Sequence, residues 1–139
     1  MLTARVSLMD KMKFRGEAGS GHTVIMDAAE QFGGENAGAR PMELLLIALG
    51  ACTGMDVISI LRKKRQEVTS YEIVVNGERA DEDPRVFTTI NVEHIVRGKG
   101  MDASAVGRAV GLSTDKYCPV IATLARVAEI QTSFRVEEG

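Results

Sequence analysis

Residues 41–61 read Pro41-Met-Glu-Leu-Leu-Leu-Ile-Ala-Leu-Gly-Ala-Cys52-Thr-Gly-Met-Asp-Val-Ile-Ser-Ile-Leu61, a mostly apolar stretch that predicts one long helix. Proline suits the first helical position, because the N–H that it lacks would have no partner there. The basic cluster Arg62-Lys63-Lys64-Arg65 complements the negative end of the helix dipole. We therefore expect the helix to run from Pro41 to about Gln66.

This helix is apolar enough to be either a membrane span or a buried helix of a soluble protein. Residues 44–61 reach the lower limit for crossing a bilayer at about 1.5 Å per residue. However, Thr53, Asp56 and Ser59 interrupt the apolar stretch, and a carboxylate near the bilayer centre is costly. The pattern favours a buried helix of a soluble protein. Because few strands are available to enclose it, we expect a homodimer in which a second copy completes the enclosure.

Length and composition indicate an ordinary globular protein. The chain has 139 residues, 45% of them hydrophobic, and a formal net charge of -2. We expect a single domain over residues 1–139. The N-terminus lacks the pattern of a secretory signal, and two cysteines are too few for a secreted disulfide framework, so the cytoplasm is the expected compartment. Without a basic stripe, no nucleic-acid partner is expected, and no membrane partner either.

The remaining sequence predicts strands around the long helix and two shorter helices after them. Strands are expected at 2–9, 12–16, 22–27, 71–77, 86–96 and 128–136, and helices at 103–114 and from Pro119. The first three strands predict an antiparallel meander, and the next two a hairpin with a long connection. Asp102 is a good N-cap for the helix at 103–114. The residues expected on its inner face are Val106, Ala109, Val110 and either Leu112 or Ser113.

The two cysteines stand in unlike settings. Cys52 lies among leucines in the long helix, where a thiol behaves as a small hydrophobic group unless a cation or hydrogen-bond donor reaches it. Cys118 precedes Pro119 and is expected to cap the short helix, where backbone N–H groups and the helix dipole lower the pKa of a thiol. Local chemistry thus favours Cys118 as the more acidic thiol. The pair can cycle between dithiol and disulfide.

Other chemical groups give weaker signals. His22 and His94 lack the spacing to either cysteine that a zinc site requires, so we expect no metal and no cofactor. Glu43 lies in the first turn of the long helix. A carboxylate is favourable there whether or not it takes part in catalysis, so both roles stay open.

The two cysteines belong to two motifs. They are Pro41-Met-Glu-Leu-Leu-Leu with Leu-Gly-Ala-Cys52-Thr, and the later Tyr-Cys118-Pro-Val. Both motifs resemble those of the OsmC/Ohr family of osmotically inducible and organic hydroperoxide resistance proteins. The resemblance covers nearly the whole chain. It implies an α+β fold that forms an intertwined homodimer, with long central helices packed between antiparallel β-sheets. It also implies a thiol peroxidase in which Cys52 attacks an organic hydroperoxide, Cys118 resolves the product as a disulfide, and a dithiol reductant restores both thiols.

The family's peroxidases also use an arginine from the N-terminal strands and a glutamate directly after the helix-opening proline. Here Met42 follows the proline and Glu43 stands one place later, about 100° around the helix. Arg15, or alternatively Arg40, is the candidate for stabilising the Cys52 thiolate. We expect an apolar pocket near Cys52 at the dimer interface. A non-enzymatic protein that binds a small hydrophobic molecule or senses oxidants is the alternative.

Overall fold

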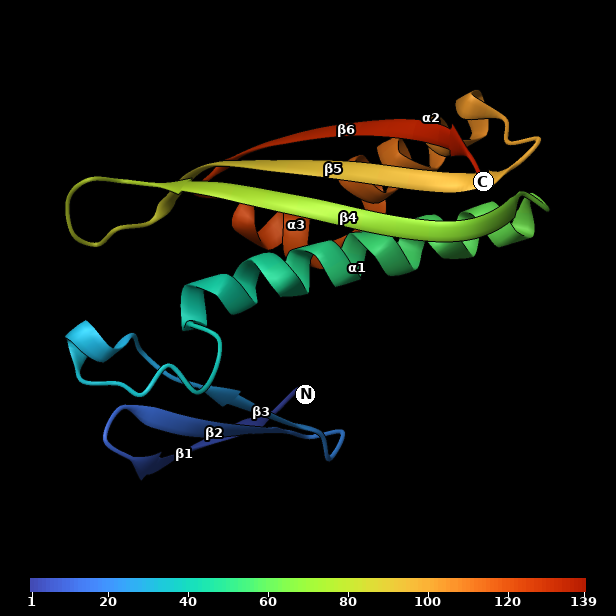
Figure 1. Ribbon diagram of the computed structural model, residues 1–139. Helices are drawn as coiled ribbons and strands as arrows, with labels where there is room; N and C mark the ends of the chain where they lie inside the picture. Colours follow the sequence, from blue (N-terminus) through green and yellow to red (C-terminus); the bar gives the residue numbers. More distant parts are fainter. The chain divides into compact units, whose positions relative to one another are not determined.

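The computed structural model describes the whole chain from Met1 to Gly139, which forms two compact units, Met1–Leu45 and Leu46–Gly139 (Figure 1). The long helix α1 (Pro41–Lys63) begins in the first unit and continues in the second. Its start at Pro41 agrees with the predicted position. The organisation of the chain as a single domain stays a prediction.

The first unit contains the predicted antiparallel meander. Its strands are β1 (Ala4–Asp10), β2 (Lys13–Ala18) and β3 (Thr23–Met26), in the order β1-β2-β3. A short 3-10 helix, Glu30–Phe32, follows. Gly21 in the turn between β2 and β3 has a φ of 92°, a conformation that glycine adopts without steric cost.

One carboxylate organises the loop after β3. Asp27 is 3% exposed, and its two oxygens accept hydrogen bonds from the backbone N–H groups of Ala28, Glu35 and Ala37 at 2.8, 3.1 and 3.1 Å. A buried carboxylate that accepts several N–H groups replaces the missing regular structure of a loop. The segment that leads into α1 is therefore held by one side chain.

The second unit contains a mixed three-stranded sheet. Its strands are β4 (Glu67–Arg79), β5 (Phe87–Lys99) and β6 (Glu129–Glu138), in the order β4-β5-β6. β4 and β5 form the predicted hairpin, with longer strands than expected because polar residues at their ends continue the pairing. β6 is parallel to β5, so the expectation of purely antiparallel sheets is wrong for this sheet. The helical connection over residues 100–128 supplies the crossover that a parallel pair requires.

That connection contains three helical segments: α2 (Ala103–Leu112), a π-helix η2 (Ser113–Tyr117) and α3 (Pro119–Leu124). The predicted N-cap of α2 is confirmed, since the carboxylate of Asp102 accepts the backbone N–H of Ser104 at 3.0 Å. Ser113 is buried and Leu112 is 39% exposed, which decides between the two candidates for the inner face. In Figure 1, α1 and α3 lie along the same face of the β4-β5-β6 sheet.

The core of the second unit lies between this sheet and the helices. Its buried cluster consists of Val57, Leu61, Val96, Val106, Ala109 and Val110, from α1, β5 and α2. Two glycines allow α1 to approach β4 closely. A Cβ on Gly50 would lie 3.2 Å from Cγ2 of Val75, and one on Gly54 would lie 2.6 Å from Cδ1 of Ile73.

Within one chain, α1 is buried on one side. The helix ends at Lys63, three residues before the predicted end, and Arg65 follows in the left-handed conformation with a φ of 58°. By length and hydropathy α1 could cross a membrane, but core helices of soluble proteins pass the same test. Ile47 and Met55 are 59% and 70% exposed. The predicted enclosure of α1 is therefore incomplete in the single chain.

Candidate functional site

The two cysteines are brought together in the second unit. Cys52 lies near the middle of α1 and is half-buried, whereas Cys118 precedes α3 and is 3% exposed. Both are free thiols, and Cys52 lies close enough to Cys118 to raise the pKa of the Cys118 thiol. Residues far apart in the sequence thus form one thiol pair.

Cys118 caps α3 as predicted. Its sulfur accepts the backbone N–H of Ile121 at 3.4 Å, and Pro119 occupies the first position of the helix. The pKa of Cys118 is not lowered by this cap as expected. Burial raises the pKa of the Cys118 thiol more than the Ile121 N–H lowers it, and the hydrogen bond and charge of Cys52 raise that pKa further. Cys118 therefore keeps its proton at neutral pH.

A buried polar cluster lies beside the thiol pair. The hydroxyl oxygens of Thr53 and Ser113 are 2.7 Å apart, and the Ser113 hydroxyl donates to Oδ2 of Asp56 at 2.8 Å. Thr53 and Ser113 are fully buried. We call these three residues the Ser113 cluster. In the sequence, Thr53 and Asp56 count against a membrane span, and nothing there links them to Ser113. Two polar residues three positions apart on an apolar helix are the signal that indicates a buried polar cluster.

A second buried polar pair joins β4 and β5. The Tyr71 hydroxyl and Nδ1 of His94 are 2.6 Å apart, and the two rings are stacked with 5.9 Å between their centroids. Burial raises the pKa of Tyr71, and the charge of Asp56 adds to that effect. Burial lowers the pKa of His94 to about 4. His94 is therefore neutral at physiological pH, and its Nε2 is a buried atom without a hydrogen-bond partner.

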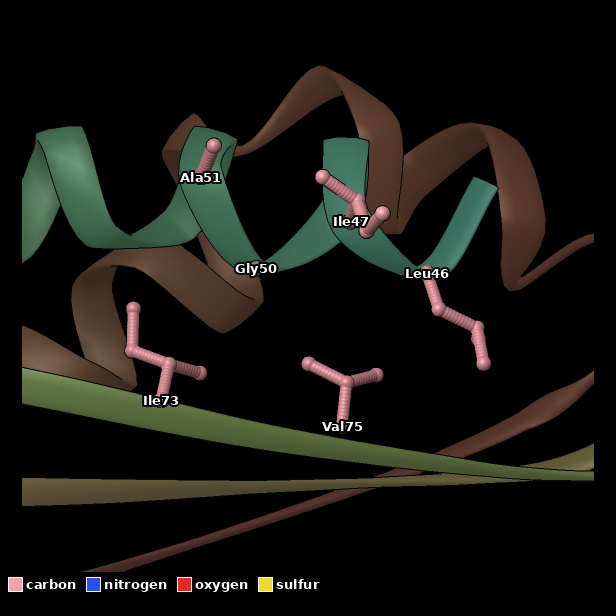
Figure 2. Close-up of a pocket in the computed structure, with 6 residues that line it drawn as sticks. All are labelled: Leu46, Ile47, Gly50, Ala51, Ile73 and Val75. Atoms are coloured by element: carbon pink, nitrogen blue, oxygen red, sulfur yellow. The ribbon is translucent and has the colours of Figure 1, made fainter. Parts of the chain in front are cut away.

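An apolar pocket of about 380 Å³ opens between α1 and β4 in the second unit. Its walls are formed by Leu46, Ile47, Gly50 and Ala51 of α1 and by Ile73 and Val75 of β4. Figure 2 shows Ile73 and Val75 rising from β4 toward α1, and Leu46 pointing toward the strand. The absence of a side chain at Gly50 leaves part of this space open. Ala51 immediately precedes Cys52, but Cys52 does not line the pocket.

The other predicted site residues, Glu43 and Arg15, belong to the first unit, as does the alternative Arg40. Oε1 of Glu43 accepts the backbone N–H of Arg40 at 2.8 Å, which is how an acidic residue caps a helix start. Nη1 of Arg15 is 3.2 Å from Glu17 in an exposed ion pair. Nη1 of Arg40 donates to the Gly38 carbonyl at 3.0 Å. Their roles toward Cys52 stay predictions.

Comparisons with known proteins cover nearly the whole chain. The family described as OsmC-like protein matches residues 33–133. Protein YhfA of Escherichia coli strain K12 is 42% identical over 135 residues, which cover 97% of this chain and 98% of YhfA. A crystal structure of a hypothetical protein from Aquifex aeolicus VF5 is 31% identical, has a TM-score of 0.88 and covers 100% of this chain and 98% of that one.

A more distant likeness is limited to the fold. The crystal structure of an organic hydroperoxide resistance protein from Elizabethkingia anophelis has a TM-score of 0.67 and 13% identity, over 100% of this chain and 96% of that one. At this identity the shared feature is the α+β fold alone.

Proposed function

The chain belongs to the OsmC-like protein family, and from this membership together with its thiol pair we propose that it is a thiol-dependent peroxidase that reduces organic hydroperoxides. The observation that carries the proposal is the proximity of the free thiols of Cys52 and Cys118. A distant relative of the same fold is described as an organic hydroperoxide resistance protein.

The reaction proceeds in three balanced steps. The Cys52 thiolate attacks the terminal peroxide oxygen, the O–O bond breaks, and the alkoxide takes up a proton to leave as the alcohol. Cys118 then attacks the Cys52 sulfenic acid, and an S–S bond forms as water leaves. A dithiol reductant finally reduces the disulfide by exchange and becomes a disulfide itself.

The environments of the two sulfurs support this order. Cys52 is half-buried, whereas Cys118 is 3% exposed and less accessible to a peroxide. Because burial and the neighbouring Cys52 raise the pKa of Cys118, this thiol keeps its proton and can donate a hydrogen bond to an ionised Cys52. Cys118 is thus suited to resolve rather than to attack.

Two further parts complete the proposal. We assign Arg15 and Glu43 to the arginine and glutamate that the family's peroxidases use with the attacking cysteine, with the arginine stabilising the Cys52 thiolate. A second copy of the chain covers the exposed side chains of α1, among them Ile47 and Met55. The protein acts as a homodimer in the cytoplasm.

The test compares wild type, Cys52→Ser and Cys118→Ser in reduced form. Each is mixed with cumene hydroperoxide and a dithiol, and peroxide loss is followed. With the dithiol present, we expect turnover by the wild type and none by Cys52→Ser. Without the dithiol, Cys118→Ser should consume one molar equivalent of peroxide and keep Cys52 as the sulfenic acid, which dimedone labels. If wild type and Cys52→Ser consume peroxide equally slowly, the proposal is wrong.

The apolar pocket favours a second candidate, the binding of a small hydrophobic molecule without catalysis. Its walls carry no charged side chain. Titration with an apolar fluorescent probe tests this, with Ala51→Leu as the variant that fills the pocket. Probe binding that Ala51→Leu abolishes, together with an absence of peroxidase turnover, would favour this function over the first.

A further inference from the structure

We propose that Ser113 is a positioning residue that holds the Cys118 segment against α1 and thereby sets the rate at which Cys118 closes the disulfide with Cys52. This inference rests on the proposed dithiol cycle and names residues of that cycle beyond the two thiols. Ser113 does not touch the reacting atoms in this role. It acts through the backbone that carries Cys118.

The side chain of Ser113 makes two directed contacts with α1. The single hydroxyl proton of Ser113 is donated to Oδ2 of Asp56, at 2.8 Å. The Thr53 hydroxyl, 2.7 Å away, must then donate to the Ser113 oxygen. Thr53 directly follows Cys52, and Asp56 lies one helical turn after it. Ser113 is thus bonded to the turn of α1 that carries Cys52.

The backbone of Ser113 is bonded to Cys118. The Cys118 N–H donates to the Ser113 carbonyl oxygen at 2.9 Å, which closes the wide turn of the π-helix Ser113–Tyr117. The same residue therefore contacts α1 through its side chain and Cys118 through its main chain. Because single π-turns within helices are rare and are often found at functional sites, this placement beside a thiol pair is informative.

The burial of the Thr53 and Ser113 hydroxyl groups indicates a positioning role in addition to packing. Thr53 and Ser113 are fully buried, and polar groups in a core are costly unless they are paired with good geometry. An apolar residue in the same space could fill the core without that requirement. Directed hydrogen bonds, in contrast, fix one register between two segments. Here they fix the position of the segment that carries Cys118 relative to the turn of α1 that carries Cys52.

Disulfide closure is the step that depends on this register. The Cys118 sulfur must approach the Cys52 sulfenic acid along the line opposite the S–O bond. The S–S bond forms, the S–O bond breaks, and the hydroxide leaves with the Cys118 proton as water. The first step, attack of Cys52 on the peroxide, does not require Cys118 to be held.

The experiment separates these two steps. Reduced protein is mixed with one equivalent of cumene hydroperoxide, quenched at intervals with acid and an alkylating agent, and analysed by mass spectrometry. For Ser113→Ala we expect an unchanged rate of Cys52 oxidation, disulfide formation slowed about tenfold, as the loss of these hydrogen bonds implies, and a larger yield of dimedone adduct on Cys52. An unchanged rate of disulfide formation in a folded variant overturns the proposal.

Matched variants exclude a general loss of stability. Thr53→Val removes the hydroxyl at constant size and should slow closure, whereas Thr53→Ser keeps the hydroxyl and should restore it. Thr114→Val is the control, because the Thr114 hydroxyl donates to the Val110 carbonyl of the preceding helix α2 and makes no hydrogen bond to α1. If Thr114→Val slows closure as much as Ser113→Ala, or if Thr53→Val and Thr53→Ser behave alike, the proposal is wrong.

A second measurement keeps this inference independent of peroxidase activity. The purified variants are equilibrated with mixtures of reduced and oxidised glutathione, and the fraction of Cys52–Cys118 disulfide is measured. Ser113→Ala should shift the equilibrium about tenfold toward the dithiol relative to wild type and Thr114→Val. An unreactive wild type in the peroxide assay contradicts the proposed function, whereas equal glutathione equilibria contradict the role of Ser113.

Discussion

The hydroxyl of Tyr71 and Nδ1 of His94 lie 2.6 Å apart inside the second unit, and no hydrogen-bond partner meets the other ring nitrogen of His94. The pair lies on neighbouring strands, β4 and β5, with its rings stacked. A histidine in this setting is folded in its neutral form, because a buried imidazolium would have no countercharge. The fold is therefore coupled to the protonation of one side chain.

We expect stability to fall as the pH is lowered from about 6.5 to about 4. The pKa of His94 is lowered to about 4 in the folded chain, whereas a histidine in an unfolded chain has a pKa near 6.5. Between these values only the unfolded chain binds the proton, so the free energy of unfolding falls by up to about 1.4 kcal/mol per pH unit. Urea unfolding at several pH values measures the slope. His94→Phe should show a shallower slope, and an equal slope would contradict the coupling.

Tyr71→Phe should lower the free energy of unfolding by about 1–3 kcal/mol. The variant keeps the ring against His94 but removes the hydroxyl, which leaves both imidazole nitrogens buried without a partner. Urea unfolding at neutral pH gives the value. Tyr117→Phe is the control, because Tyr117 is 50% exposed and its change should stay within about 0.5 kcal/mol. Equal losses in the two variants would show that the buried hydrogen bond contributes nothing specific.

The sequence predicted those features that depend on neighbouring residues. Three such features act within a few residues of the chain, and the structure has each of them at the predicted place. They are the helix start at Pro41, the three alternating N-terminal strands, and the N-cap Asp102 of α2. The parallel pairing of β6 with β5 depends on a crossover of the whole helical connection, so the local pattern could not reveal it. The pKa of Cys118 departs from the expectation for a related reason. Its cap is local, but the burial that outweighs the cap comes from the tertiary fold.

The sequence predicted only part of the candidate site. The motifs around Cys52 and Cys118 indicated the thiol pair, because the resemblance rests on those residues. The Ser113 cluster was not indicated, since the contact between Ser113 and Thr53 joins positions separated by 60 residues. Hydrogen bonds between distant segments leave no periodic signal in a single sequence.

Asp27→Ala should lower the melting temperature by several degrees and loosen the loop that precedes α1. The carboxylate is buried, which alone would raise its pKa, but the backbone N–H groups of Ala28, Ala37 and Glu35 together lower it. Asp27→Asn should have a smaller effect, because the amide oxygen still accepts some of these bonds. Differential scanning calorimetry measures both. Asp10→Ala, at an exposed position of the same unit, is the control, and a loss as large as that of Asp27→Ala would contradict the role of the loop.

The same carboxylate predicts a pH dependence in the acid range. A lowered pKa in the folded chain means that the ionised form of Asp27 stabilises the fold above the ordinary carboxyl pKa. This contribution is lost as the pH falls through the folded-state value. The melting temperatures of wild type and Asp27→Asn should therefore converge in strong acid, and a constant difference down to the lowest pH would contradict this reasoning.

Arg15→Ala should lower the rate constant for peroxide reduction by about 100-fold, whereas Arg40→Ala should change it little. The two arginines are expected to differ because their side chains make different contacts in the structure. The guanidinium of Arg40 donates to the Gly38 carbonyl and so supports its own loop, whereas Arg15 pairs with Glu17 at an exposed position, an interaction that is weak and easily exchanged. Arg15→Lys should recover part of the rate, because it keeps the charge but not the paired donors of a guanidinium.

The measurement is competition for hydroperoxide against a thiol enzyme of known rate, with circular dichroism to show that each variant is folded. Arg5→Ala, on the neighbouring strand β1, is the control for a general change of charge in the first unit. A larger loss in Arg40→Ala than in Arg15→Ala would assign the activating role to Arg40. Full activity in both variants would mean that neither arginine stabilises the Cys52 thiolate, and that the chain has replaced the family's arginine by another group.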